Sequence, residues 1–374
     1  MKKLNIILLM FLIPALGFGQ LYTRKEIKIP DIPGYLTLKC DLHMHTVFSD
    51  GNVWPTVRAD EAWREGLDVF AISDHVEYQP HKEDITTGIG RSYEIAKPRA
   101  DELGLMIIRA AEITRDMPPG HFNVLFLDSI SALYKDNFWQ AIQAAVDQDA
   151  FIFWNHPGWR QPDEIPIWYD EHSRLYDEGH MHGMEIVNER SYYPLAHQWC
   201  LEKNITMLGN SDIHNPTGMD IDFAEGAHRA ITLVFAEKFT EESVKEALVK
   251  GRTAVYYKDM LMGKQEFLKP IFEKSVNIAN RSVELGPGET FNLQVTNNSE
   301  VPFILEAAEG EKDIFYQENV TLYPGRTSII RIRSKQIAEP GIHTYTLRFV
   351  VSNLLTGVET GLPVELKFKA KIVD

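Results

Sequence analysis

Two histidines that lie two residues apart, His43 and His45, give the first indication of metal chemistry in this sequence. They belong to the run DLHMH, which is typical of the end of a strand, and Asp50 follows closely. Because alternate residues of a strand point to the same face, the two imidazoles would face one side together. Converging imidazoles suit a transition metal such as zinc. The pair alone, however, fits a hydrogen-bonded core equally well.

More histidines and carboxylates lie where other predicted strands begin or end. All 13 histidines except His343 lie between His43 and His228. Nine potential ligands share such a position: His43, His45, Asp50, His75, Glu112, His121, His156, Asp212 and His214. They offer nitrogen and carboxylate donors without a thiolate, which favours zinc, manganese or iron over copper(I) or an iron–sulfur cluster. The whole set therefore predicts a metal centre.

The elements that must position these residues alternate between short apolar runs and amphipathic segments from about residue 36 to residue 257. This alternation is typical of βα units. Helical spacing predicts helices over residues 55–66, 93–103, 138–148 and 240–250. The carboxyl ends of the strands are where α/β barrels carry their active sites. We therefore expect an α/β barrel over residues 20–262, with the nine residues at its mouth.

The pattern changes after a connecting segment at residues 263–275. Residues 276–374 alternate apolar and polar side chains with period two, and Gly, Pro and Asn turns separate the runs. This predicts an antiparallel, immunoglobulin-like β-sandwich of about 100 residues. The only cysteines, Cys40 and Cys200, cannot form a disulfide framework. We expect them to pack as small hydrophobic side chains.

The N-terminus and the charge balance restrict where the protein acts and on what. Residues 1–19 resemble a secretory signal peptide, with Lys2 and Lys3 before an apolar run at residues 4–18. The run is shorter than the roughly 20 residues that span a bilayer, so we expect cleavage before Gln20, without membrane insertion, and a periplasmic or secreted product. The net charge of −15 disfavours a nucleic-acid polymer as partner.

Four segments in this order, DLHMHTVFSDG, ISDH, NHPG and GNSDIH, resemble the PHP (polymerase and histidinol phosphatase) superfamily of metal-dependent phosphoesterases. The resemblance covers about residues 36–257 and implies a distorted (β/α)7 barrel that holds two or three divalent metals. It implies a first metal at His43, His45, Glu112 and Asp212. It also implies that Glu112 bridges to a second metal at His121 and His156, and that Asp50, His75 and His214 hold a third. Asp50 stands where some members have histidine, which leaves the metal's identity open.

Such a centre predicts hydrolysis. A water that bridges two metals becomes hydroxide at neutral pH, and the metals neutralise phosphoryl oxygens. We therefore expect small phosphate mono- or diesters as substrates, with Glu112, Asp212 and His214 as catalytic residues. Asp212 or a nearby histidine would assist proton transfer. Arg160 and Arg229 could each clamp a phosphate through two hydrogen bonds, or form ordinary ion pairs at the barrel rim.

Two other interpretations compete with the phosphoesterase. An amidohydrolase also begins with two histidines on its first strand, but it often bridges its metals with a lysine of the fourth strand. The predicted fourth strand, FNVLFLD, has no lysine. A non-catalytic protein, with a glycan-binding sandwich and a structural metal in the barrel, is disfavoured because structural sites usually close around four ligands.

Overall fold

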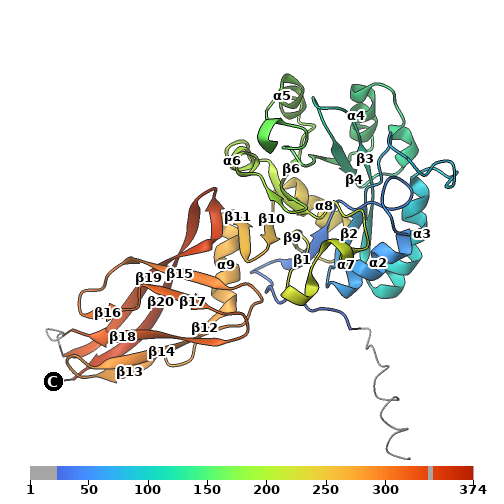
Figure 1. The fold of residues 1–374 in the computed structure, drawn as a ribbon. Coiled ribbons are helices and arrows are strands. Elements are labelled where there is room, and N and C mark those ends of the chain that lie inside the picture. The colour runs from blue at the N-terminus through green and yellow to red at the C-terminus, as the bar shows by residue number, and fades with distance from the viewer. Residues whose placement is uncertain (1–22, 336–339, 374) are drawn as a thin grey trace, which may run out of the picture.

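The computed structural model describes residues 23–335 and 340–373, which form an α/β barrel followed by a β-sandwich (Figure 1). The signal peptide predicted for residues 1–19 lies outside the described residues. Among the described residues, no helix combines the length and the apolar character that crossing a bilayer requires.

The barrel sheet has the strand order β9-β1-β2-β3-β4-β5-β6, and β8 also pairs with β6. Its strands are β1 (Leu36–Asp41), β2 (Val69–Ile72), β3 (Met106–Ile113), β4 (Phe122–Leu125), β5 (Phe151–Trp154), β6 (Gly183–Asn188), β8 (Thr206–Asn210) and β9 (Ile231–Ala236). Most neighbours are parallel, but β4 is antiparallel to β3 and β5, and β9 is antiparallel to β1. The prediction of a uniform series of βα units is therefore wrong at these strands. No crossover helix separates β3 from β4, so the chain returns antiparallel.

Helices cover the barrel at the four predicted places: α2 (Pro55–Arg64), α3 (Gly90–Leu103), α4 (Phe138–Val146) and α8 (Glu241–Val249). Helices α5 (Asp170–Asp177) and α6 (Pro194–Lys203) also surround it. Helix α2 begins with proline, whose missing N–H costs nothing at that position. The side chain of Thr240 caps α8 by accepting a hydrogen bond from the backbone N–H of Ser243. The four sequence-based helix predictions are confirmed.

The barrel closes between the ends of β1 and β8, where only an isolated bridge joins Met44 to Ile213. The backbone N–H of Asp212 donates to the carbonyl of His43 at 2.9 Å. Arg58 of α2 reinforces this junction from a fully buried position. Its guanidinium donates to the Glu61 carboxylate and to the backbone carbonyls of His45, Ile213, His214 and Asn215, at 2.7–2.9 Å. One side chain thus ties together the two loops that carry the HxH and SDIH motifs.

The C-terminal unit is the expected sandwich. One sheet has the order β12-β14-β18-β16, with β12 at Val276–Ile278, β14 at Thr290–Asn297, β18 at Thr327–Ser334 and β16 at Ile314–Tyr316. The other contains β13 (Ser282–Leu285), β20 (Thr360–Ile372), β19 (Gly341–Gly357), β15 (Phe303–Glu309) and β17 (Asn319–Leu322). Alternate residues of β20 are buried, as period two predicts. Cys40 and Cys200 are both buried free thiols in the barrel.

The two units are joined more closely than a connecting segment implies. Most of residues 263–275 form the helix α9 (Gln265–Ser275), and Phe272 packs edge-on against Phe303 of the sandwich at 5.1 Å. Strands β10 (Thr253–Tyr257) and β11 (Met260–Gly263) extend the barrel sheet, and Leu261 of β11 pairs in parallel with Leu354 of β19. One cluster of buried apolar side chains therefore runs from barrel to sandwich.

This shared core predicts that both units unfold together. Replacing Phe272, which is 2% exposed, by alanine should lower the free energy of unfolding by about 3–5 kcal/mol and shift one common transition. The matched control Phe315→Ala, at a side chain that is 61% exposed, should cost less than about 1 kcal/mol. Calorimetry and denaturant titration measure both quantities. Two well-separated transitions in the unmodified protein would contradict a common core.

Candidate metal centre

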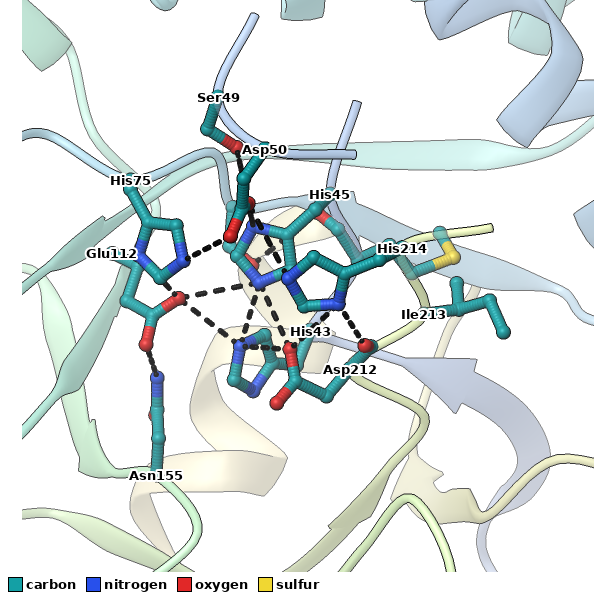
Figure 2. A network of polar contacts seen from close by, with 12 residues as sticks. His43, His45, Ser49, Asp50, His75, Glu112, Asn155, Asp212, Ile213 and His214 are labelled. Carbon is teal, nitrogen blue, oxygen red and sulfur yellow. Dashed lines mark hydrogen bonds and ion pairs between the residues drawn. The ribbon is translucent and has the colours of Figure 1, made fainter. Parts of the chain in front are cut away.

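The structure brings all nine predicted ligands together at one mouth of the barrel. Figure 2 shows seven of them, with the imidazoles and carboxylates turned toward one another. The donor atoms form four overlapping groups. These are His45, Asp50, His75 and His214; His43, His45 and Asp212; His43, Glu112 and His156; and His75, Glu112 and His121. These groups differ from the three predicted metal sets, because His121 and His156 fall in separate groups and His45 also joins the group around Asp50. Ligation of a metal by each residue stays a prediction.

Four donor atoms lie close together at the centre. The Nε2 atoms of His43 and His45 lie 3.1 Å apart, and each lies 3.2 Å from Oε2 of Glu112. The Asp212 Oδ1 atom lies 3.1 Å from the His43 nitrogen and 2.9 Å from the His45 nitrogen. Two imidazoles and two carboxylates with donor atoms at these separations are ligand types that zinc binds.

Unsatisfied polar atoms in the same place support a cation. Oδ1 of Asp212 and Nδ1 of His156 are both buried, and neither makes a hydrogen bond. Buried polar atoms without a partner are rare and cost about 1–3 kcal/mol each. A divalent cation among the four central atoms would give the Asp212 oxygen its partner. The residues present therefore fit a metal of this class.

Glu112 connects the central group to its neighbours. While Oε2 faces His43 and His45, Oε1 lies 2.8 Å from Nδ1 of His121 and 3.5 Å from Nε2 of His156. One carboxylate thus presents separate oxygens to two sets of imidazoles. This arrangement suits a carboxylate that bridges two cations.

Asp50 organises the outermost group in the same manner. Its Oδ2 lies 3.4 Å from Nε2 of His75, and its Oδ1 lies 3.3 Å from Nε2 of His214. The ring of His45 stacks against the rings of both His75 and His214, with centroids 4.5 and 4.3 Å away. In His214, Nδ1 contacts the backbone carbonyl of Asp212 at 2.7 Å, which directs Nε2 toward Asp50.

The buried carboxylates at the centre require positive charge nearby. Burial by itself would raise the pKa of Glu112, but His75, His43 and His121 hold that pKa well below its usual range. The pKa of Asp212 is low for the same reason, with His43 and His45 beside it. Conversely, Asp212 and Glu112 outweigh the burial of His45 and raise its pKa to about 10. Without metal, protons on the imidazoles therefore provide the positive charge that these carboxylates attract.

A buried carboxylate that the sequence analysis missed, Glu185, orients the ligands from behind. On β6, it accepts hydrogen bonds from Nδ1 of His43 at 2.9 Å and from the backbone N–H of His156 at 2.7 Å. The side-chain amides of Asn188 and Asn210 complete its partners at 2.8 and 3.0 Å. A carboxylate on Nδ1 fixes the imidazole tautomer so that Nε2 has its lone pair free for a metal. The available signal was a single acidic residue within the otherwise apolar and amide strand GMEIVN.

The two arginines predicted to bind substrate have different environments. Arg160 lies on the rim of a cleft of about 840 Å³ that contains the candidate ligands. Its side chain is 63% exposed, and its only ion pair within residues 23–335 and 340–373 is with Asp116, which is 92% exposed. Arg229, by contrast, is buried and forms 2.7 Å ion pairs with Asp41 and Glu65. Because Nη2 of the same guanidinium makes no hydrogen bond among the described residues, phosphate binding by Arg229 stays a prediction.

The position of Glu185 generates a prediction about metal affinity. In Glu185→Gln, an amide N–H₂ group would replace one carboxylate oxygen and face a hydrogen-bond donor, so His43 or His156 would lose its anchor. We expect metal affinity to fall about 10–100-fold, as measured by competition with a chelating dye. The exposed control Glu83→Gln should leave it unchanged. Equal affinity in the two variants would show that Glu185 does not orient the ligands.

Comparisons with known proteins agree with this centre. The family profile of an Ig-like domain matches residues 276–367. No functionally curated protein matches the chain. A crystal structure of a two-domain protein from Bacteroides vulgatus, described as containing a predicted PHP-like metal-dependent phosphoesterase, is 42% identical. It covers 92% of this chain, this chain covers 99% of it, and the TM-score is 0.87.

Two other structures resemble parts of the chain at 16% identity. One is described as a candidate metal-dependent phosphoesterase, from Bifidobacterium adolescentis; the match covers 57% of this chain and 96% of that one, with a TM-score of 0.39. The other is an amidohydrolase from Chromobacterium violaceum. That match covers 48% of this chain and 89% of the amidohydrolase, with a TM-score of 0.37. Neither likeness is close enough to discriminate between the two reactions. The identity and coverage of the Bacteroides protein do decide the family: the chain belongs to the PHP-like metal-dependent phosphoesterases.

Proposed function

We propose that this protein is an exported hydrolase of small phosphate mono- or diesters that works with two or three divalent transition metals, zinc, manganese or iron. The observation that carries the proposal is the position of Glu112, whose two oxygens face separate groups of imidazoles. When bound, metals at these groups would lower the pKa of water to near neutrality and offset the negative charge of a phosphoryl group. The family of the chain supports the reaction class.

Different residues of the chain would bind the cations, accept the proton and orient the ligands. Glu112 and the surrounding histidines would hold the cations at fixed separation. Asp212 lines the cleft, and its ionised carboxylate can accept a proton from the attacking water. Asn188 restrains that carboxylate by donating to Oδ2 at 3.3 Å. His214 would keep its Nε2 directed at the third group through its contact with the Asp212 carbonyl.

Arg160 is placed to receive an anionic oxygen of the substrate. Its guanidinium lies over the ring of Trp159 at 4.4 Å, and Arg160 lines the cleft. Among the described residues, the guanidinium donates one hydrogen bond, to Asp116. An exposed ion pair such as Arg160–Asp116 contributes about 0–1 kcal/mol, so a phosphate can displace Asp116 at little cost. A planar guanidinium also matches two phosphoryl oxygens at once.

Export and reaction class are tested on the purified protein. N-terminal sequencing of the protein exported by a bacterial host that processes signal peptides should find cleavage near Gln20. A panel of phosphomonoesters, phosphodiesters and amides should show turnover of phosphoesters alone. Turnover of amides without phosphoesters would instead establish the amidohydrolase alternative.

Two substitutions should separate the central group from the outer one. Glu112→Gln should lose at least one metal per chain and lower kcat/KM for p-nitrophenyl phosphate by at least about 100-fold, because both groups share this carboxylate. Asp50→Asn should retain the central metals and lower turnover about tenfold. Elemental analysis and steady-state kinetics measure these effects. Equal metal loss in both variants would contradict separate groups.

Metal removal should also destabilise the fold. A cation that binds only the folded state stabilises it by about 2.7 kcal/mol at 100 times its dissociation constant. Treatment with a chelator should therefore lower the melting temperature, and zinc or manganese should restore it together with activity. The Glu112→Gln variant serves as the control and should respond weakly. A melting temperature that ignores the chelator would argue against tightly bound metal.

A further inference from the structure

A second cleft adjoins the metal centre. Its volume is about 890 Å³. Its walls are formed by side chains within residues 211–230 after β8, by residues 256–259 at the end of β10 and the turn that follows, and by Glu300 of the sandwich. Glu189, Asp212 and His214 line both this second cleft and the first cleft described above. Two candidate ligands therefore stand where the clefts meet. A phosphorus atom held beside Asp212 would have space for a substituent on each side.

Strand β6 ends at Asn188, and the short strand β7 covers Ser191–Tyr192. The turn between them forms the boundary between the two clefts. Glu189 occupies this turn with a positive φ of 48°, a conformation that is uncommon for residues other than glycine. Its backbone N–H donates to the carbonyl of Asn210, at the end of β8, at 3.2 Å. The turn thereby presents a carboxylate at the junction. A monoester dianion would be repelled there more strongly than a diester monoanion.

The charges of the second cleft limit what its occupant can be. Besides Asp212, it is lined by six carboxylates: Glu189, Asp220, Asp222, Glu225, Asp259 and Glu300. Four basic side chains also line it: Lys25, Arg190, Lys258 and Arg229. Lys25 pairs with Glu300 at 3.2 Å, and Arg229 is neutralised by Asp41 and Glu65 beneath the cleft. Negative charge is therefore in excess, and the cleft disfavours an anionic group.

We propose that this enzyme acts on phosphodiesters in preference to monoesters, and that the second cleft holds an alcohol group that is neutral or positively charged. The inference rests on the proposed function, which it narrows to one substrate class. Hydrolysis forms a bond from the water oxygen to phosphorus and breaks the ester bond to the other alcohol, which leaves with the electron pair. The proton released by water passes to the Asp212 carboxylate and from there to solvent.

The test compares two esters that share a leaving group. p-Nitrophenyl phosphorylcholine is a diester with a cationic alcohol, and p-nitrophenyl phosphate is the monoester that lacks choline. With the metal-loaded full-length protein, kcat/KM should be at least about tenfold higher for the diester. A preference for the monoester would overturn the inference and leave the proposed function intact. Hydrolysis of neither ester would overturn the proposed function, and the inference with it.

Two tryptophan variants locate the choline group. Ala227 is exposed and lines the second cleft, so Ala227→Trp should fill it and lower the diester-to-monoester ratio of kcat/KM about tenfold. Ala224, three residues earlier in the same exposed loop, lines neither cleft. Ala224→Trp should keep the ratio within about twofold. Equal ratios in the two variants, at wild-type metal content and melting temperature, would overturn the assignment of the second cleft.

Discussion

The closure of the barrel between β1 and β8 is the constraint on which the rest of the structure depends. These strand ends share only one isolated bridge, so their carbonyl groups need other donors. Arg58 supplies them from α2 and, with Glu61 as its counter-charge, satisfies all its own donors in a buried position. Since the loops joined in this way carry His43, His45 and Asp212, the same contacts that close the fold also set the separation of the central donor atoms.

The carboxylates of the centre need nearby positive charge, from protonated imidazoles or from a metal cation. Glu112 and Asp212 are buried, and an isolated buried carboxylate costs several kcal/mol. Two candidate ligands also have backbone conformations that are unfavourable outside glycine, with φ of 28° at His156 and 50° at Asp212. The backbone N–H of His156 donates to Glu185, and the side-chain amide of Asn188 donates to Asp212, so hydrogen bonds support both conformations. Charge and strain are thus concentrated where the family performs its chemistry.

The sandwich contributes to this arrangement although the candidate ligands all lie in the barrel. It continues the barrel sheet through the pairing of Leu261 with Leu354, and its Asn353 side chain donates to the backbone carbonyls of Asp259 and Pro302. Asp259 and Glu300 lie on the wall of the second cleft. The position of that wall therefore depends on the attached sandwich, which gives a physical reason for two units in one chain.

The sequence by itself determined the classes of element and the types of donor. Alternation of apolar runs with helical spacing predicted the barrel, period two predicted the sandwich, and the motifs at strand ends placed nine nitrogen and carboxylate donors at one mouth. These features are local, because the side-chain period depends only on neighbouring residues. Tertiary structure alone decided the reversed direction of β4, the burial of Arg229 and the role of Glu185. Glu185 meets His43 across 142 residues, and only the order of strands in the closed sheet brings such distant groups into contact.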